Sequence, residues 1–335
     1  MPVSKNCGIQ VKRVSTLVYY KGMKCLVTGS SGFIGSTLAY SLLKMGHEVV
    51  GIDCYTENYS RHLKEENTKR LLFFEKFTHF DSDLSELELG KILKDVESIF
   101  HLAGQASVHS SWGGSFELYT ERNIEVTHSL LRAALEAGVG KFINSSSSSV
   151  YGRILSNSVN EFALTNPVSP YGVTKLAAEN LVSLYGSEFG LKTISLRYFT
   201  VYGPKQRPDM AFNKLISAGI TGNKFPLHGD GTQIRDFTYV QDVVEANIAA
   251  ATLDLAPGTI LNIGGGSPQS MNSVISDVEE ILGVQINLIK QPLGPGNPLV
   301  TGADCTKAYE ILNWAPKMEF YDGLKNQVKW QLEQT

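Results

Sequence analysis

The sequence predicts an α/β fold that combines a doubly wound parallel sheet with a smaller mixed α/β unit toward the C-terminus. Short apolar runs alternate with segments of helical periodicity through residues 24–199, and this alternation is typical of βαβ units. Several of the runs have no polar face, as expected for strands that helices cover on both sides. With 335 residues, of which 42% are hydrophobic, the chain is large enough to bury such a core.

The predicted elements follow one another in a regular order. The first βαβ unit consists of a strand at 24–29, a helix at 33–47 and a strand at 48–53. The alternation then continues with a strand at 98–103, a long helix at 116–138, a strand at 141–146, a helix at 171–189 and a strand at 192–199.

Proline and glycine become frequent after residue 200, where we expect a second unit to begin. A helix at 243–255 and a strand at 259–264 are expected to return to the first sheet. We therefore expect an N-terminal extension at residues 1–22, with Met23 a candidate original start. A larger domain is expected at residues 23–199 together with 234–266, and a smaller domain at residues 200–233 together with 267–335.

Charge and cysteine content exclude several classes of function. The 30 basic and 33 acidic residues give a net charge of −3, which does not favour nucleic acid or an anionic membrane as a partner. The four cysteines lack the spacing of a disulfide framework or a zinc site, so we expect no metal and a reducing, cytoplasmic location. No apolar run has the length of a membrane span, and no signal peptide is recognisable.

The segment TGSSGFIG places Gly29, Gly32 and Gly35 between the first strand and the first helix. Glycines at this spacing let the backbone approach a pyrophosphate, whose charge then lies at the helix N-terminus. A tight turn without a ligand is the alternative, and the position of the segment within the first βαβ unit makes it the weaker interpretation.

Asp53 ends the second strand, 18 residues after Gly35. A carboxylate at this place binds the ribose 2′-hydroxyl of a dinucleotide and repels a 2′-phosphate, so NAD is favoured over NADP. Arg61 and Lys64, which we expect in the following loop, leave an opening for the phosphorylated cofactor.

The segment YGVTK places Tyr171 and Lys175 four residues apart in a predicted helix. Residues at this spacing share one helix face, so the Lys175 ammonium can favour the phenolate of Tyr171. A tyrosine with an ordinary pKa of about 10 needs such help to act as a base at neutral pH. The pattern is common by chance, but it gains weight beside a dinucleotide-binding segment.

Five segments, in the order TGSSGFIG, HLAG, SSSSSVYG, YGVTK and RDFTYVQDV, resemble the extended short-chain dehydrogenase/reductase family, in particular its nucleotide-sugar epimerases, dehydratases and decarboxylases. The resemblance covers residues 23–335 and implies a Rossmann domain for NAD, a smaller domain for a UDP-sugar, and a triad of Ser147, Tyr171 and Lys175. It further implies a set of residues around the cofactor: Gly29, Ser31, Gly32, Phe33, Ile34, Asp53, Asp83, Leu84, Leu102, Ala103, Gly104, Tyr171, Lys175 and Tyr198.

The resemblance also bears on the reaction. In this family Tyr171 would take the proton of the sugar 4-hydroxyl while NAD takes hydride from C4. Dehydratases and decarboxylases carry acidic residues just before the Val of the serine motif, where this chain has Ser148 and Ser149. Without an acid, the 4-keto sugar is expected to turn over and take hydride back on its other face, which makes the chain a 4-epimerase.

The segments RYFTVYGPKQRPDMAF and DCYTENYSRHLK look most similar to those of the UDP-glucuronate 4-epimerases. In that group the hydroxyls of Ser148, Ser149 and Thr200 would hold the C6 carboxylate, and Arg207 would anchor the nucleotide or steer the sugar. A 4-keto uronate is a β-keto acid that loses CO₂ readily, so neutral donors rather than an apolar pocket suit its carboxylate. An exposed loop arginine is the alternative for Arg207.

The segment LHGDGTQIRDF suggests that His228 stacks on the uracil and that Arg235 binds the diphosphate. Two departures from the uronate group accompany this expectation. His109 occupies a position where relatives usually carry an arginine, and residues 294–300 lack the second diphosphate arginine.

Three alternatives stay open beside UDP-glucuronate 4-epimerisation. A UDP-glucose or UDP-N-acetylhexosamine 4-epimerase, including one for the N-acetylated uronate, shares every motif except the fit of the three hydroxyls. A UDP-glucuronate decarboxylase is disfavoured by the missing acid, and a non-catalytic NAD-binding regulatory protein by the complete triad. The resemblance implies a homodimer formed through the helices at 116–138 and 171–189.

Overall fold

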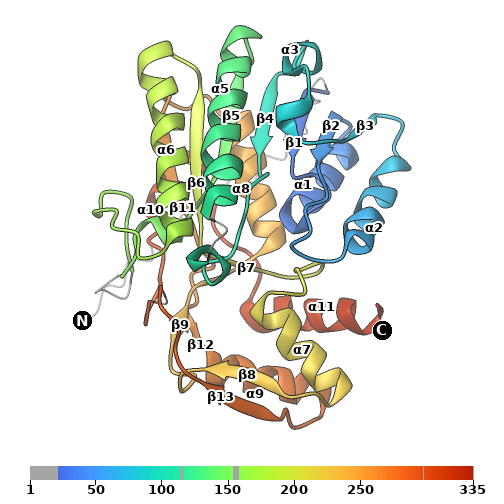
Figure 1. Ribbon diagram of the computed structural model, residues 1–335, viewed down its shortest axis with the longest axis vertical. Coiled ribbons are helices and arrows are strands. Elements are labelled where there is room, and N and C mark those ends of the chain that lie inside the picture. Colours follow the sequence, from blue (N-terminus) through green and yellow to red (C-terminus); the bar gives the residue numbers. More distant parts are fainter. Residues whose placement is uncertain (1–21, 114–115, 154–157, 297, 335) are drawn as a thin grey trace, which may run out of the picture.

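The computed structural model describes residues 22–113, 116–153, 158–296 and 298–334, so nearly all of the expected N-terminal extension lies outside the described residues. Seven parallel strands form one sheet in the order β11-β6-β5-β4-β1-β2-β3 (Figure 1). Their bounds are Lys24–Thr28 (β1), Glu48–Asp53 (β2), Phe77–Asp81 (β3), Ser98–His101 (β4), Lys141–Ser147 (β5), Thr193–Tyr198 (β6) and Thr259–Ile263 (β11). The expected doubly wound parallel sheet is confirmed.

The strand order reverses at β1, which pairs with β2 on one side and with β4 on the other. The chain first builds the sheet outward through β2 and β3, and then continues from β4 in the opposite direction. In open α/β sheets a crevice forms at the carboxyl ends of the strands beside such a reversal, and ligands bind there.

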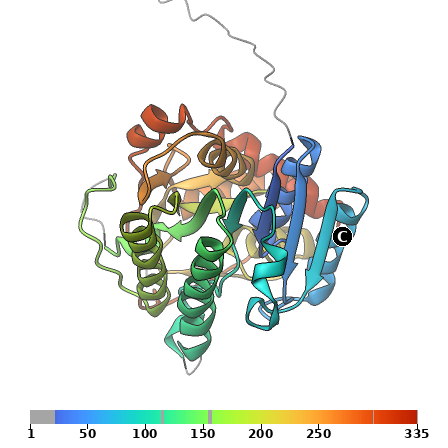
Figure 2. The ribbon, with the colours of Figure 1, turned by 90° about the horizontal axis from the view of Figure 1, so that it is seen from above.

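Helices cover both faces of the sheet, and Figure 2 shows α5 and α6 on one face with α8 on the other. Helices α1 and α8 pack against each other over one hydrophobic cluster, while α5 and α6 pack over a second cluster. The bounds of the helices in this part are Phe33–Lys44 (α1), Arg61–Leu72 (α2), Leu89–Ile92 (α3), Phe116–Thr120 (α4), Val126–Glu136 (α5), Pro170–Phe189 (α6) and Val240–Thr252 (α8).

Two sequence expectations about helices were wrong in detail. Residues expected in a loop after β2, including Arg61 and Lys64, begin helix α2. The long helix expected over 116–138 is interrupted by a π-helical turn at Glu121–Glu125, between α4 and α5. Such turns insert one residue into a helix and are frequent at functional sites, and this one carries Asn123 into the cavity described below.

The remaining elements lie mostly beyond the carboxyl edge of the sheet (Figure 1). Their core is aromatic, with Tyr202, Phe212, Phe237 and Phe320 in mutual contact. The bounds are Thr200–Tyr202 (β7), Ala211–Thr221 (α7), Phe225–His228 (β8), Ile234–Arg235 (β9), Phe237–Tyr239 (β10), Gln269–Ser270 (β12), Met271–Leu282 (α9), Leu288–Gln291 (β13), Thr306–Leu312 (α10) and Phe320–Leu332 (α11).

The chain passes between the two parts more than once. Strand β11 pairs with β6, so the segment expected to return to the first sheet does return. Helix α10 packs on β11, and its Ala308 and Leu312 belong to the hydrophobic cluster beneath α1 and α8. The exact domain boundaries given above stay a prediction. Within the described ranges, no helix combines the length and apolar character needed to cross a bilayer.

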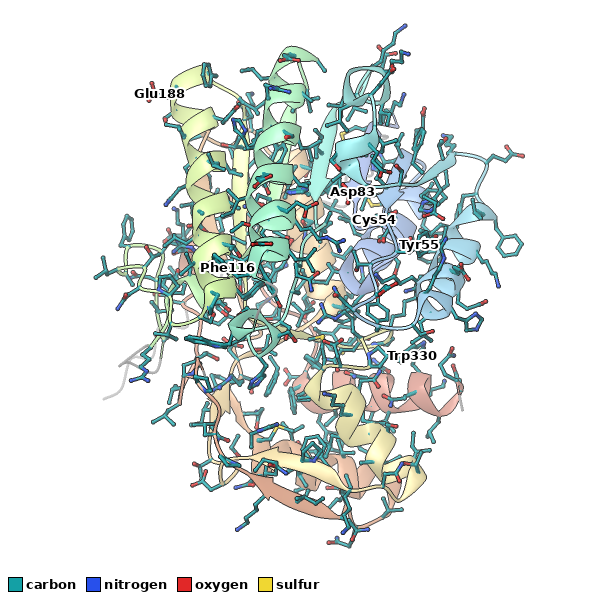
Figure 3. All side chains as sticks on the ribbon, in the orientation of Figure 1. Cys54, Tyr55, Asp83, Phe116, Glu188 and Trp330 are labelled. Atoms are coloured by element: carbon teal, nitrogen blue, oxygen red, sulfur yellow. The ribbon has the colours of Figure 1, made fainter. Side chains whose placement is uncertain are left out.

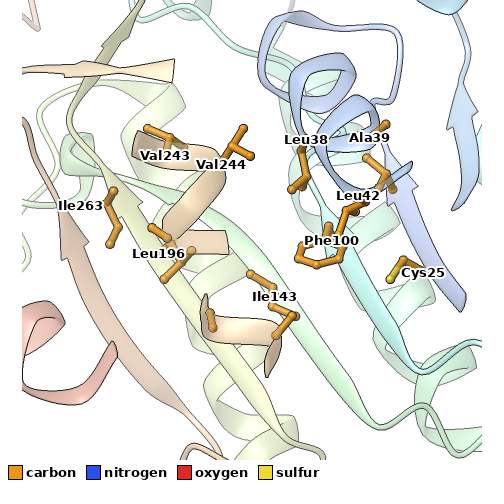
Figure 4. Close-up of a cluster of buried hydrophobic side chains, with 14 of the residues drawn as sticks. Cys25, Leu38, Ala39, Leu42, Phe100, Ile143, Leu196, Val243, Val244 and Ile263 are labelled. Carbon is orange, nitrogen blue, oxygen red and sulfur yellow. The ribbon is translucent and has the colours of Figure 1, made fainter. Parts of the chain in front are cut away.

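Leu196 of β6 lies at the centre of the core shown in Figure 4 and is fully buried. We predict that Leu196→Ala lowers the free energy of unfolding by about 2–5 kcal/mol, because it removes buried methyl groups and leaves a cavity. Leu164→Ala is the matched control, since the Leu164 side chain is 85% exposed, and its effect is expected to stay within about 0.5 kcal/mol. Equal losses in urea titrations of the two variants would contradict this account of the core.

Candidate active site

A cavity of about 550 Å³ opens at the carboxyl edge of the sheet, beside the strand reversal. Its walls follow the ends of β1 through β6 and continue into residues 200–211. The volume is within the range of small-molecule sites. Most of the sequence-predicted site residues line it: Gly29, Gly32, Phe33, Ile34, Asp53, Asp83, Leu84, Leu102, Ala103, Gly104, Ser147, Ser148, Ser149, Tyr171, Lys175, Tyr198, Thr200 and Arg207.

Close backbone packing explains two of the glycines at the start of the cavity. Gly29 has φ +70°, and an added Cβ would lie 2.9 Å from the backbone nitrogen of Ala103. At Gly35 an added Cβ would lie 2.1 Å from the carbonyl oxygen of Gly29. The N-terminus of α1 carries no acidic residue in its first turn and no side-chain cap, so its backbone N–H groups are available to an anion at this edge of the cavity.

Asp53 ends β2 with its carboxylate held in place by two backbone groups. Oδ2 accepts a hydrogen bond from the Ser31 N–H at 3.0 Å, and Oδ1 accepts one from the Tyr55 N–H at 2.9 Å. Ser31 itself is buried and does not line the cavity; its contribution is to orient Asp53. Figure 3 labels Cys54, Tyr55 and Asp83, which lie close together near the ends of β2 and β3.

The two cations that left an opening for NADP already have acceptors within the protein, although Lys64 lines the cavity. Arg61 forms ion pairs with Glu65 and Asp81 on the protein surface. The Lys64 ammonium donates hydrogen bonds to the Thr56 carbonyl at 2.7 Å and to its hydroxyl at 2.9 Å. Together with the Asp53 carboxylate, this arrangement favours NAD over its 2′-phosphorylated form.

The sequence reasoning missed several residues that line the cavity. Asn123 accepts a hydrogen bond from the Gln105 N–H at 2.8 Å and donates to the Gln105 carbonyl at 3.0 Å, which fixes the loop after β4. The side chains of Asn58 and Gln105 exchange two hydrogen bonds and join the loop after β2 to the same region. Arg122 also lines the cavity, and its buried Nε has no hydrogen-bond partner among the described residues. No local pattern in the sequence marks these positions.

These features fit a bound NAD molecule. The glycine cradle gives a pyrophosphate close access to backbone N–H groups, Asp53 is placed for a ribose hydroxyl, and Arg122 offers an unsatisfied donor. When bound, NAD supplies a reversible acceptor for hydride.

The candidate triad lines the same cavity, with Tyr171 and Lys175 at the start of α6 and Ser147 at the end of β5. Ser169 caps this helix by accepting a hydrogen bond from the Gly172 N–H at 3.1 Å, and Tyr171 and Lys175 follow on one helix face. Burial raises the pKa of Tyr171, whereas a hydrogen bond with Ser147 and the positive charge of Arg207 lower it. Burial is the largest of these effects, so the pKa of Tyr171 is raised overall, and the expected help from Lys175 stays a prediction.

The Lys175 ammonium acts on different neighbours. Burial lowers the pKa of Lys175 to about 8, while the carboxylate of Glu179 one turn further along α6 opposes this shift. Burial, together with the positive charge of Lys175, lowers the pKa of His101 to about 3. The imidazole of His101 is therefore neutral, and its ring nitrogens are hydrogen-bonded to the hydroxyls of Thr28 and Thr127, each at 2.9 Å.

The consecutive serines form regular structure and part of the cavity wall, so they are not a flexible linker. Ser146 and Ser147 end β5, and Ser148 and Ser149 begin a 3₁₀ turn. The Ser147 hydroxyl accepts a hydrogen bond from the Ser149 N–H at 3.1 Å, and it donates to the Ser149 hydroxyl at 3.1 Å. Residues Ser145 to Ser149 all line the cavity together with Tyr171, although the Ser146 hydroxyl is buried and donates to Glu179.

Arg207 reaches the cavity but is already paired. Its Nη2 and Nε donate to the two carboxylate oxygens of Asp209 at 2.6 and 2.9 Å. Asp209 also lines the cavity, so the statement that no acid stands near the sugar site needs correction. This carboxylate accepts both hydrogen bonds from Arg207, which limits its use as a proton donor.

Two predicted substrate residues do not line the cavity. Arg235 donates through Nη1 to the backbone carbonyls of Ile234 and Leu299. His228 lies in β8 and stacks on His109, with ring centroids 5.6 Å apart, and of the two only His109 belongs to the cavity wall. The roles assigned to His228 and Arg235 stay predictions.

Comparisons with known proteins agree with this geometry. Residues 25–264 match the model of the NAD dependent epimerase/dehydratase family. The chain is 41% identical over 309 residues to an uncharacterized UDP-glucose epimerase, YtcB, of Bacillus subtilis (92% of this chain, 98% of the relative), and 35% identical over 312 residues to a UDP-glucuronate 4-epimerase of Thermodesulfobacterium geofontis (92% and 96%). The UDP-glucuronic acid 4-epimerase of Bacillus cereus, solved with UDP-glucuronic acid and NAD, superposes with a TM-score of 0.91 at 40% identity (93% of this chain, 100% of that chain).

Gly29→Ala tests the cradle, and Gly138→Ala is its matched control. The two glycines share nearly the same φ, +70° and +69°, but an added Cβ at Gly138 meets nothing within 4 Å. We predict that both substitutions cost about 1 kcal/mol of stability through the left-handed backbone. Only Gly29→Ala is expected to weaken NAD binding, about tenfold or more, in calorimetric titrations of the apoprotein, because it pushes on the loop that carries Ala103. Equal NAD affinities of the two variants would contradict the cradle.

Proposed function

Because the chain belongs to the NAD-dependent epimerase/dehydratase family, we propose that it is a 4-epimerase that interconverts UDP-glucuronate and UDP-galacturonate. The observation that carries the proposal is the set of neutral hydroxyls of Ser148, Ser149 and Thr200 in the same cavity as Tyr171 and Ser147. Hydroxyls donate to a carboxylate and, unlike a cation, leave the ring free to turn between its two orientations.

In the proposed reaction Tyr171 takes the proton of the sugar 4-hydroxyl, and Ser147 hydrogen-bonds the oxygen that becomes the 4-keto group. Arg207 supports this step because its charge opposes the rise in pKa that burial imposes on the phenol. Lys175 holds its positive charge at the same end of the helix. The keto sugar then turns over, and Tyr171 returns the proton after hydride has come back to the opposite face of C4.

The surroundings disfavour the other reactions of the family. Elimination between C5 and C6 needs an acid beside the sugar. The acidic side chains of the cavity wall are Asp53 and Asp83, which follow β2 and β3 at the cofactor end, and Asp209, which is paired with Arg207. The same absence of a free acid counts against the decarboxylases.

Retention of the carboxylate follows from its solvation. A 4-keto uronate is a β-keto acid, and its loss of CO₂ is fastest where the carboxylate is poorly solvated. Ser148, Ser149 and Thr200 offer three donors, and the Ser149 side chain is already oriented by its contact with Ser147. The Arg207–Asp209 pair adds a cation whose charge is largely balanced, so Arg207 can steer the sugar without holding the carboxylate fixed.

The proposal also covers contacts with the nucleotide, the oligomeric state and the cellular location. We assign His228 to the uracil and Arg235 to the diphosphate, which requires both to approach the cavity when the substrate binds. We also propose a homodimer through the α4–α5 and α6 surfaces, where the large apolar side chains of Phe116, Val173, Leu184 and Phe189 are between 41% and 59% exposed. A reducing, cytoplasmic location is consistent with the free thiols of Cys25, Cys54 and Cys305.

A UDP-glucose 4-epimerase is the second candidate, and one observation favours it. His109 in the cavity wall is mostly neutral, because burial and the nearby charges of His228 and Lys214 lower its pKa. Together with the paired Arg207, this leaves the cavity with little free positive charge for a uronate. The same observation favours a neutral UDP-N-acetylhexosamine, but not its uronate, which carries the same negative charge as glucuronate.

Incubation of the purified protein with UDP-glucuronate, UDP-glucose and UDP-N-acetylglucosamine in turn, followed by chromatography and proton NMR, tests the substrate. We predict conversion of UDP-glucuronate to UDP-galacturonate without pentose or CO₂. Tyr171→Phe is expected to lower kcat about 10²–10⁴-fold while NAD stays bound, because it removes the proton acceptor. Tyr309→Phe, at a mostly exposed phenol, is the control and should match the wild type. Turnover of a neutral sugar alone would contradict the uronate assignment.

Thr200→Val tests the carboxylate contact by removing one hydroxyl with little change in shape. We predict that kcat/KM for UDP-glucuronate falls about 10–100-fold, as for loss of a hydrogen bond to a charged group, while activity on UDP-glucose, where measurable, is unchanged. Some release of pentose is expected as well. Thr221→Val, at an exposed position at the end of α7, serves as the control. Unchanged kinetics of Thr200→Val would show that Thr200 does not hold the carboxylate.

A further inference from the structure

A buried ion pair lies directly behind the candidate triad. The Arg197 Nη2 donates to Glu179 Oε1 at 2.6 Å, and its Nε donates to Oε2 at 3.0 Å. The side chains are only 4% and 1% exposed. Bidentate pairing of this kind is what makes two charges tolerable inside a protein.

The pair is the centre of a larger hydrogen-bond network. The Ser146 hydroxyl donates to Glu179 Oε2 at 2.5 Å. On the other side, Arg197 Nη1 donates to the Tyr151 phenol at 2.7 Å, and the phenol donates to the Asn262 side chain at 2.7 Å. The network thereby joins α6 to β5, β6 and β11 at the carboxyl edge of the sheet.

Three residues of the hydrogen-bond network lie beside cavity residues, either along the chain or one turn away on α6. Glu179 follows Lys175 by one helical turn and so lies on the same face of α6. Ser146 precedes Ser147, and Arg197 precedes Tyr198, which lines the cavity. A shift of the ion pair would therefore move the Lys175 and Ser147 side chains relative to each other.

We propose that Glu179 is a positioning residue for Lys175: its contacts with Arg197 and Ser146 fix the turn of α6 that carries the ammonium to the end of β5, and they hold a negative charge one helical turn from that ammonium. The consequence for turnover rests on the proposed function. The positioning itself does not, because it concerns only groups of this chain.

The electrostatic surroundings of Lys175 support the proposal. Burial drives its pKa down toward neutrality, and Glu179 is the group that opposes this. The other titratable or charged groups around Lys175 are Tyr171 on the same helix, His101 on β4, and Arg197 on β6 behind Glu179. His101 is neutral above pH values near 3, and Tyr171 carries no charge at rest. Among these groups, Glu179 is therefore the one that carries a negative charge.

Competitive acetylation with acetic anhydride across a pH series, with the Lys175 peptide quantified by mass spectrometry, measures the Lys175 pKa without any turnover. Three variants are compared with the wild type. Glu179→Gln removes the negative charge and leaves Arg197 unpaired. The double variant Glu179→Gln with Arg197→Met leaves no unpaired charge, so it covers the case in which the single variant does not fold. Tyr151→Phe is the control, because it removes a hydrogen bond of the network without changing a charge near Lys175.

We expect the labelling midpoint of Lys175 to fall by about one pH unit in Glu179→Gln, by less in the double variant, and not at all in Tyr151→Phe. The alkaline limb of the kcat profile should move by the same amount, with KM for the sugar nucleotide unchanged. Midpoints equal to the wild type in both Glu179 variants would overturn the proposal. If the wild type epimerises none of the sugar nucleotides, the proposed function is refuted. The labelling result still decides the role of Glu179 in that case.

Discussion

The pairing of β1 with both β2 and β4 is the constraint on which the rest of the site depends. Because the sheet grows in opposite directions from this pair, the loops after β1 and β4 lie side by side at the carboxyl edge. They approach so closely that Gly29 has no room for a side chain beside Ala103. The hydroxyl of Thr28 accepts hydrogen bonds from the Leu102 and Ala103 N–H groups, which fixes this contact. The cavity for the cofactor is the space that this reversal leaves open.

Three positively charged side chains near the cavity are paired with acceptors of the protein. Lys64, Arg197 and Arg207 are all largely buried near the cavity, and each has hydrogen-bond acceptors from the protein itself. Removing a cation from water is costly unless a partner compensates for it. Lys175 has no direct ion pair among the described contacts, and burial lowers its pKa to about 8. The site thus contains one poised ammonium and one buried phenol among neutral hydroxyls, an arrangement suited to moving a proton at an alcohol rather than to eliminating water.

Elements with strong periodicity were predictable from the sequence, and contacts between distant elements were not. Strand β2 was predicted with its observed bounds, and α6 to within one residue, because apolar residues mark them. Helix α2 was missed because its surface is polar and only Lys64, Thr68 and Leu71 are buried. The roles of Asn123 and Arg122 depend on a π-helical turn, and the Arg207–Asp209 pair depends on loop geometry; neither leaves a pattern in the sequence. The Tyr171–Lys175 pair and the glycine segment could be placed because their spacing is local, whereas Ser147 was assigned through the resemblance to the family.

The central claim is that hydride leaves C4 of the sugar and returns to the same carbon of the same molecule. UDP-glucuronate deuterated at C4, incubated with the purified protein in ordinary water, tests this most directly by mass spectrometry and proton NMR of the product. The account predicts UDP-galacturonate that keeps its deuterium at C4 and gains no solvent hydrogen at C5. Loss of the label to solvent, or release of a pentose in place of the epimer, would contradict it.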